Sequence, residues 1–341
     1  MDDMTYVIDE LKKLMAIDSP TGFTREVAEF LIGELKALGY EPKMTVKGGV
    51  LCDLGGVDRE NALLLGAHVD TLGGMVAQVK PDGRLRLTNV GGIQPQNIEA
   101  ENCVVVTRDG RRIEGTFQLI NASVHVNKNY ATAERNFDTM EVVLDEVTSS
   151  KEETEALGVE VGCFVCFDPK TVVTQSGYIK SRFLDDKLSA AILLGYARYL
   201  KEEKITPPRR IYLHFTVYEE VGHGGGASIP DGVTEMIAVD MGCVGEGLAC
   251  TEREVSICVK DGPGPSNYDV VNRMIALCKE HGLGYAPDVY PYYGSDADVA
   301  VGNYDIRHIV IGAGVYASHG YERSHVDGVR NTLELLKYYT A

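Results

Sequence analysis

The feature that most constrains this fold is a continuous apolar run near the start of the chain. Residues 61–68 read NALLLGAH, so six apolar or small residues lie between an asparagine and a histidine. A strand with one face in water alternates apolar and polar residues, whereas a strand buried on both faces does not. Strands of the second kind belong to parallel sheets that helices cover on both sides. The run therefore predicts an α/β fold class.

Helical and strand-like patterns alternate along most of the chain. Apolar residues recur at helical spacing over residues 6–15 and again over residues 27–38. Strands alternating with helices indicate a mostly parallel sheet flanked by helices. Later segments follow the same order, with strands expected at 210–217, 236–239 and 306–311, and helices at 188–200, 268–280 and 332–339.

The pattern changes between residues 71 and 165. Short alternating runs are separated there by Asp-Gly turns, at Asp82-Gly83 and again at Asp109-Gly110. Such turns between alternating runs are hairpin signals. We expect an inserted antiparallel, β-barrel-like domain over residues 71–165, and an α/β domain made of residues 1–70 and 166–341.

Composition limits the classes of partner. The chain has 341 residues and a formal net charge of −17, which argues against nucleic acid or an anionic membrane as the partner. No segment reaches the roughly 20 apolar residues of a membrane span, and the first residues lack the features of a secretory signal. The eight cysteines are scattered, and we expect them to be buried and reduced. A reducing compartment, most simply the cytoplasm, is therefore predicted.

Acidic and histidine-bearing clusters follow the strand-like runs. Ligands of open α/β sheets bind at the carboxyl ends of strands, so we expect these clusters to converge on one edge of the sheet. Carboxylate oxygens and imidazole nitrogens suit divalent cations, and a paired site needs one carboxylate to bridge two ions. The clusters are His68-Val69-Asp70, Asp185-Asp186, Glu219-Glu220, Asp240, and a tail with His319 and His325.

No cluster is diagnostic by itself. A lone His-x-Asp is more often a hydrogen-bonded pair than a metal ligand, and adjacent acidic residues are usually solvated. Here, however, the acidic pairs adjoin apolar segments. Burying unpaired carboxylates there would cost on the order of several kcal/mol, which bound cations would offset.

Taken in order, these motifs resemble one known family. The set is similar to that of the tetrahedral aminopeptidase and glutamyl aminopeptidase family of dinuclear metallopeptidases, and the resemblance covers essentially the whole chain. It implies that the inserted domain serves as a dimerisation or lid domain and helps to build a large homo-oligomer, such as a dodecamer. The motifs are Gly66–Asp70, Phe183–Lys187, Glu219–Gly222, Val239-Asp240 and Gly294–Asp298.

The resemblance implies two divalent ions per subunit. Zinc is expected first, with cobalt and manganese as alternatives because both suit mixed carboxylate and imidazole ligands. One ion would be bound by one histidine and one aspartate, the other by one glutamate and one histidine, with a second aspartate bridging them. These ligands would be His68 and Asp240, then Glu220 and His319, and the bridging Asp185.

The resemblance also implies two catalytic roles. Glu219 would be the general base acting on the metal-bridging water, and Asp70 would hold the second ring nitrogen of His68. The last metal ligand is ambiguous, because the family's histidine and glutamate near the last strand are spaced differently here. Spacing favours His319, with His325 as the rival.

We therefore expect a metal-dependent aminopeptidase that acts on peptides with a free N-terminus. Residues 294–297 should contribute to its substrate pocket, and the glycine-rich residues 222–226 should form a tight loop beside the glutamate pair. A deacylase of small N-acyl amides with the same site is an alternative. A glycoside hydrolase would use paired carboxylates but leaves His68 and His319 without a role. A non-enzymatic relative would leave Glu219 unexplained.

Overall fold

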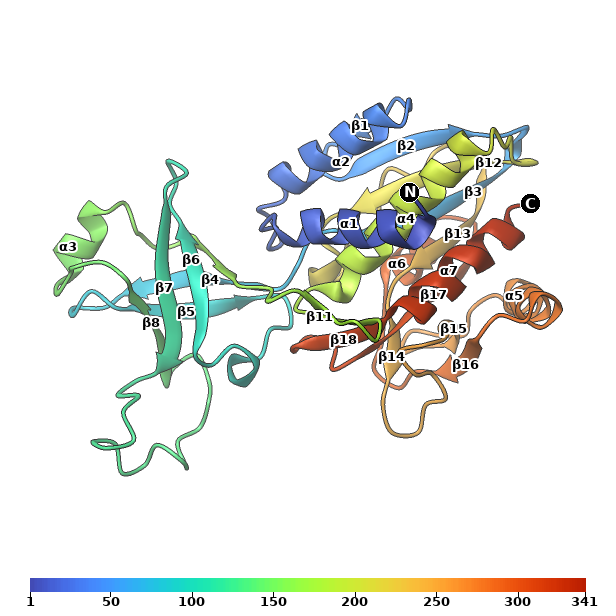
Figure 1. Ribbon diagram of the computed structural model, residues 1–341. Helices are drawn as coiled ribbons and strands as arrows, with labels where there is room; N and C mark the ends of the chain where they lie inside the picture. Colours follow the sequence, from blue (N-terminus) through green and yellow to red (C-terminus); the bar gives the residue numbers. More distant parts are fainter. The chain divides into compact units, whose positions relative to one another are not determined.

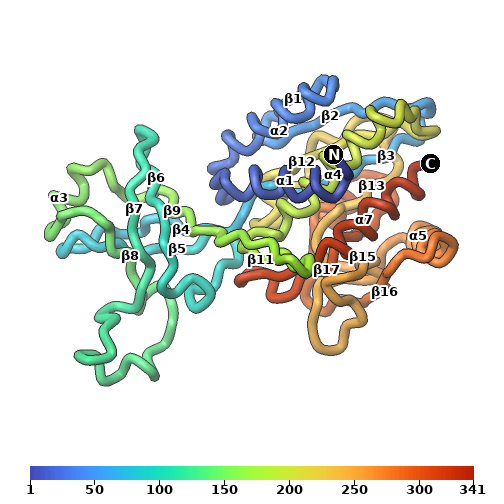
Figure 2. The backbone as a smooth tube through the Cα atoms, viewed as in Figure 1, coloured from blue at the N-terminus to red at the C-terminus, as the bar shows by residue number.

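The computed structural model describes residues 1–341, and the chain forms two compact units. One unit comprises residues 1–70 and 170–341, and the other comprises residues 71–169 (Figure 1). The chain thus leaves the first unit once and returns to it, as the tube in Figure 2 shows. The second junction lies after residue 165 because β9 (Phe164–Phe167) is a strand of the inserted unit.

Four parallel strands form the centre of the sheet in the first unit. Their order is β12 (Arg209–Thr216), β3 (Asp58–His68), β13 (Val233–Val239) and β17 (Arg307–Tyr316). The apolar run lies in β3, between two parallel neighbours, and residues 62–68 are all buried. Hydrophobic packing on both faces explains why this strand lacks alternation.

Strands that are mostly antiparallel to their neighbours complete the twelve-stranded sheet at its edges. β1 (Lys43–Met44) and β2 (Val50–Gly55) extend it beyond β12, and the other additions lie beyond or beside β17. The remaining strands are β10 (Val172–Val173), β11 (Tyr178–Ser181), β14 (Gly242–Val244), β15 (Val255–Lys260), β16 (Tyr285–Val289) and β18 (Glu322–His325). The sheet is therefore parallel where ligands are expected and mixed outside that region, where β14 pairs with β17 and β15 with β16 in parallel.

Helices cover both faces of this sheet. On β3, Leu63 and Leu65 join the large core under the helices, while Ala62 and Leu64 join a smaller cluster with Ala300 of α6. In Figure 1, α1, α4 and α7 lie together over one face. The α/β prediction is thus confirmed. The helices are α1 (Asp3–Met15), α2 (Arg25–Ala37), α4 (Leu184–Glu202), α5 (Tyr268–His281), α6 (Asp296–Asn303) and α7 (Val326–Tyr339), with a 3₁₀ turn η2 (Glu219–Val221).

The inserted unit is a closed antiparallel barrel, as predicted. Its first hairpin turns where Asp82-Gly83 had indicated, with Gly83 at φ +82°, a conformation that glycine adopts at little steric cost. Alternation in β7 places every second residue in the barrel core. The strand order is β4 (Gly73–Val79), β5 (Leu85–Val90), β8 (Met140–Leu144), β7 (Arg112–Leu119), β6 (Glu101–Val106) and β9, and the unit also contains η1 (Pro95–Asn97) and α3 (Lys151–Ala156).

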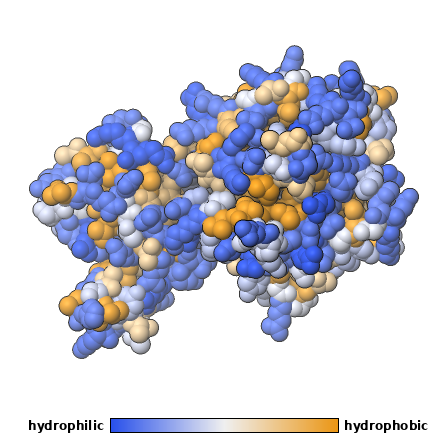
Figure 3. Space-filling view, in the orientation of Figure 1, coloured by the Kyte–Doolittle hydropathy of each residue, from blue (hydrophilic) through white to orange (hydrophobic).

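No helix combines the length and apolar character that crossing a membrane requires. The face shown in Figure 3 is mostly hydrophilic, with hydrophobic side chains confined to smaller areas.

Candidate metal centre

The predicted clusters converge at the carboxyl ends of the central strands. His68 is the last residue of β3, and Asp240 directly follows β13. Glu219 and Glu220 lie in η2 after β12, and His319 lies in the loop after β17. Parallel strands end at the same edge of a sheet, which explains how residues so distant in sequence meet.

Asp185 reaches this edge from the start of α4. Asp185 and Asp186 have non-helical backbone angles, and the peptide bond between them is cis. The two side chains contact different groups, since Asp186 Oδ2 accepts a hydrogen bond from the His68 backbone N–H at 3.2 Å. The Asp185 side chain faces the rings of His68 and His319.

The first candidate metal trio consists of His68, Asp185 and Asp240. Potential ligand atoms of these three residues lie within 4.8 Å of one another, and all three side chains are buried. The closest pair is His68 Nε2 and Asp185 Oδ1, at 3.0 Å. We call this group the strand trio because two of its members end adjacent parallel strands.

The second candidate metal trio consists of Asp185, Glu220 and His319. Its potential ligand atoms also lie within 4.8 Å of one another. His319 Nε2 is 3.5 Å from both Asp185 Oδ2 and Glu220 Oε2. We call this group the loop trio. Asp185 thus offers one carboxylate oxygen to each trio, the arrangement that a bridging ligand requires.

The orientation of the His68 ring fits metal binding. Its Nδ1 lies 2.9 Å from the backbone oxygen of Asp70, which must accept a hydrogen bond. Nδ1 therefore carries the proton in the neutral ring, and Nε2 keeps a lone pair directed at Asp185. Histidines that bind metals usually donate their other N–H in this way.

The Asp70 side chain has a different position from the one expected. Its Oδ1 is 3.7 Å from His68 Nδ1, so the backbone oxygen of Asp70 is the nearer partner. The carboxylate accepts hydrogen bonds from Thr21 Oγ1 at 2.6 Å and from the backbone N–H groups of Glu219 and Glu220 at 3.2 and 3.4 Å. Asp70 therefore anchors both the His68 ring and the start of the glutamate turn.

Burial and mutual repulsion shape the protonation of this site. Burial raises the pKa of Glu219 and of Glu220 well above the usual value, and burial with the charge of Asp185 raises the pKa of Asp240 to about 7. Burial alone would lower the pKa of His68, but the carboxylates of Glu219 and Asp185 raise it well above its usual value. So many acidic groups in a small buried volume favour bound cations, which would stabilise the charged forms. The donor set therefore fits two divalent ions.

Glu322 is a site residue that the sequence did not single out. It is 2 % exposed, and its two oxygens accept hydrogen bonds from the backbone N–H groups of Asp185 at 3.1 Å and His319 at 3.0 Å. It thereby links the shared carboxylate to the loop that carries His319. Asp185 and Glu322 are 137 positions apart, so no local pattern could have indicated the contact.

His325 lies outside both trios. Its Nδ1 accepts a hydrogen bond from the Asp327 N–H at 3.0 Å and so caps the start of α7, while Nε2 is 2.8 Å from the backbone oxygen of Ser176. Both ring nitrogens are occupied. The structure brings His319, and not its rival, to Asp185 and Glu220.

The glycine-rich residues 222–226 form a tight loop that Asp296 holds. Asp296 Oδ1 accepts a hydrogen bond from the Gly225 N–H at 2.6 Å, and Asp296 also accepts one from Thr216. A Cβ added to Gly224 would lie 2.3 Å from Asp296 Oδ1, so only glycine fits there. Asp296 thus connects the residues 294–297 segment to the chain that follows Glu220.

A cavity of about 710 Å³ opens onto both trios. Asp185, Glu219, Glu220, Asp240 and His319 line one side of it, and Gly294 and Ser295 also contribute to its wall. Glu219 Oε2 lies 3.6 Å from His68 Nε2 without belonging to either trio. A carboxylate in this position can accept and return a proton beside the metal ligands.

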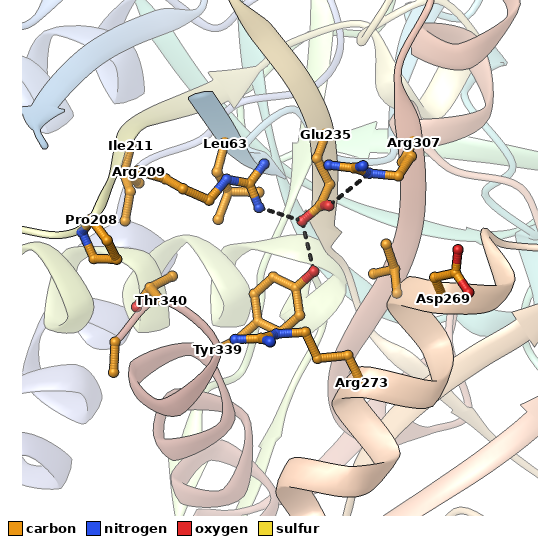
Figure 4. Close-up of a pocket in the computed structure, with 12 residues that line it drawn as sticks. Leu63, Pro208, Arg209, Ile211, Glu235, Asp269, Arg273, Arg307, Tyr339 and Thr340 are labelled. Carbon is orange, nitrogen blue, oxygen red and sulfur yellow. Dashed lines mark hydrogen bonds and ion pairs between the residues drawn. The ribbon is translucent and has the colours of Figure 1, made fainter. Parts of the chain in front are cut away.

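A second cavity, of about 360 Å³, lies at the opposite, amino ends of the strands (Figure 4). Glu235 at its centre is contacted by Arg209 at 3.0 Å, Arg307 at 3.1 Å and the Tyr339 hydroxyl at 2.8 Å. These contacts neutralise the buried Glu235 carboxylate, so this side chain has a structural role.

Comparison with known proteins identifies the family. The family model for M42 glutamyl aminopeptidase matches residues 48–335. This chain belongs to the M42 family. The M42 chain is 43% identical over 340 residues to YhfE of Bacillus subtilis, a proposed aminopeptidase, and the match covers 99% of this chain and 98% of that protein. It is thus a peptide hydrolase of a metal-dependent family, which confirms the resemblance.

Solved structures show the same fold. The M42 chain superimposes on aminopeptidase APDkam598 from the archaeon Desulfurococcus kamchatkensis with a TM-score of 0.88 and 22% identity, covering 99% of this chain and 95% of that one. The TET1 peptidase of Pyrococcus horikoshii gives a TM-score of 0.85 and 21% identity, covering 98% and 99% of the two chains. The fold is therefore that of known aminopeptidases over nearly its full length.

Proposed function

We propose that this M42 aminopeptidase uses two divalent metal ions to remove N-terminal residues from peptides. The observation that carries the proposal is the position of Asp185, whose two oxygens face two separate histidine-bearing trios. If Asp185 only formed a hydrogen-bonded pair with one histidine, the second trio would have no role. Two ions sharing one carboxylate would use every member.

In this proposal the strand trio holds one ion and the loop trio holds the other. Zinc is the first expectation from the mixture of imidazole and carboxylate donors, with cobalt and manganese also suited to it. When bound, such ions polarise a carbonyl group and lower the pKa of a coordinated water.

The protein side chains then supply positioning and proton transfer. Glu219 would take a proton from the attacking water and deliver it to the nitrogen of the leaving peptide, so that the carbon–nitrogen bond breaks without a free amide anion. Asp70 keeps η2 in place through the N–H groups of Glu219 and Glu220, and it would therefore set the direction in which Glu219 points.

The charge of the site supports selection of a free N-terminus. Three more acidic residues, Glu219, Asp186 and Glu322, lie beside the five residues of the two trios. The two ions would balance the ligand carboxylates, and the acidic groups beyond them would attract a substrate ammonium group, whereas an N-acylated substrate has no charge to offer. This difference favours an aminopeptidase over a deacylase.

We also propose an assembly and a location. The Pyrococcus horikoshii relative assembles into a tetrahedron or a large octahedral shell, and the same fold supports a homo-oligomer here, such as a dodecamer, with the barrel as the dimerisation or lid domain. All eight cysteines are free, which is consistent with the reducing cytoplasm.

Hydrolysis of aminoacyl-anilides and unblocked peptides tests the proposal. Activity should be lost on chelation, return when zinc, cobalt or manganese is added, and be absent from Glu219→Gln with metal still bound. N-acetylated versions of the same peptides provide the matched control. Cleavage of N-acetylated amides, with no hydrolysis of any substrate that has a free amino group, would show that the protein is a deacylase.

A further inference from the structure

The wall of the active-site cavity that faces the metal centre is mainly apolar. Beyond the acidic and histidine side, most of its lining comes from two segments, the chain after β13 and the chain after β16, and the chain after β15 adds Pro263. The first segment contributes Met241, Cys243 and Leu248, and the second contributes tyrosines and a proline. A substrate fixed at the metal centre would therefore meet apolar surface directly beside its reacting bond.

Three of these side chains are only partly buried. Cys243, Leu248 and Tyr293 pack against a small core cluster that includes Tyr290 and Ala297, yet each keeps some surface exposed. All three also line the cavity. Partly exposed apolar side chains gathered around a concave surface are typical of ligand pockets.

Three tyrosines line this wall; Tyr292 is 98 % exposed, and the hydroxyls of the other two are bound within the protein. The Tyr290 hydroxyl is hydrogen-bonded to Ser256, and the Tyr293 hydroxyl donates to the backbone oxygen of Met241 at 3.0 Å. The polar ends of Tyr290 and Tyr293 are therefore satisfied by the protein. A ligand would contact the rings, whose centroids are 5.1 Å apart.

Charge in the cavity disfavours an acidic substrate side chain. No lysine or arginine lines it, and the only basic side chain in the wall, His319, belongs to the loop trio. The additional carboxylate, Asp298, accepts a hydrogen bond from the Ser295 N–H at 2.9 Å and caps α6. A substrate glutamate would thus lose water, gain no cation and lie near carboxylates.

We propose that this apolar wall is the binding pocket for the side chain of the substrate's N-terminal residue, and that it selects leucine, methionine and phenylalanine over glutamate. The inference rests on the proposed aminopeptidase function and adds the substrate class. Leu248 and Tyr293 are the specificity-determining residues. One methylene group in a hydrophobic pocket changes kcat/KM by roughly 10- to 200-fold, so leucine should exceed alanine by at least about 10-fold.

Two measurements test the pocket on the full-length, metal-loaded protein. The first is kcat/KM for the leucyl, methionyl, phenylalanyl, alanyl, lysyl and glutamyl anilides. The second is calorimetric binding of leucinamide and of the α-amide of glutamate to Glu219→Gln, which needs no turnover. Leu248→Ala should lower the leucine-to-alanine ratio about 10-fold, and Leu248→Arg should raise the glutamyl rate relative to the leucyl rate. Val289→Ala, at an exposed position beside Tyr290, is the matched control and should change neither ratio.

The outcomes separate the pocket from the proposed function. Glutamyl anilide as the best substrate, or a leucyl rate no higher than the alanyl rate, would overturn the pocket while leaving the aminopeptidase intact. Leucinamide binding that Leu248→Ala weakens, without cleavage of any anilide, would support the pocket and overturn the function. Failure to bind either amide would overturn the pocket whatever the rates are.

Discussion

The strand trio and the loop trio are held by different kinds of backbone. His68 and Asp240 follow directly from adjacent parallel strands and are 2 % and 5 % exposed. Glu220 and His319 lie in a 3₁₀ turn and a loop, and the His319 side chain is 39 % exposed. Elements in a sheet position side chains more tightly than loops do. One half of the centre is therefore preformed, and the other depends on the contacts that hold its loops.

The largest expected effect comes from removing the proton acceptor that both trios would serve. Glu219 belongs to neither, so Glu219→Gln should lower kcat by about 10²- to 10⁴-fold while the protein still binds two metal ions per chain. Steady-state rates and elemental analysis measure the two quantities. Glu246→Gln, at an exposed position, is the control. Loss of metal together with activity would show that Glu219 is a metal ligand and contradict its role as a general base.

Substituting the two histidines separates the trios directly. In metal-free protein, His68→Ala removes the partner of buried carboxylates and should lower the free energy of unfolding by about 3 kcal/mol. His319→Ala removes a partly exposed side chain and should cost less than about 1 kcal/mol. Urea denaturation in the presence of a chelator compares the two variants. Equal losses would show that the strand trio is no more preformed than the loop trio.

Acid should weaken the sheet that carries the strand trio. Burial lowers the pKa of His214, on β12, to about 4 from 6.5, so the folded chain binds fewer protons than the unfolded chain between these values. The stability that His214 contributes is complete above pH 6.5 and is lost as the pH falls through 4, by about 3 kcal/mol. His214→Leu should flatten denaturation curves over this range. His281→Leu, at an exposed position, should not, and an unchanged slope for His214→Leu would contradict the assignment.

The smallest effect should fall mainly on the loop trio, because Glu322 holds the His319 loop in addition to the shared Asp185. Glu322→Gln keeps the size of the side chain but leaves one oxygen for two N–H donors, those of Asp185 and His319. Affinity for the more weakly bound metal ion should fall about 10- to 100-fold, with little change in the tighter one. Calorimetric metal titration measures both affinities, and Glu280→Gln on the surface of α5 is the control. An equal loss at both ions would place Glu322 in the support of the whole centre.

Local patterns were sufficient to predict much of the fold. The unbroken apolar run of residues 61–68 predicts a strand buried on both faces, and β3 lies between two parallel strands as that pattern requires. The Asp82-Gly83 turn predicts the first barrel hairpin because glycine suits the positive φ found there. Strand patterns were less visible outside the four central strands, and β15 and β16 had no clear signal. The start of α7 was also missed, because the helix begins at Val326, six residues before the predicted start, and a histidine side chain caps it.

The sequence by itself determined which residue types stand at the strand ends, since the order of buried runs sets where each strand stops. Spacing favoured His319 over His325 but could not decide between them, because spacing along a loop does not say which ring turns toward Asp185. Only the tertiary structure decided that choice, by using both nitrogens of His325 in the cap of α7 and in a contact with Ser176. The roles of Glu322 and of the apolar wall at Leu248 also became visible only in the tertiary structure. Both depend on contacts between segments far apart in the chain, and local periodicity carries no information about such contacts.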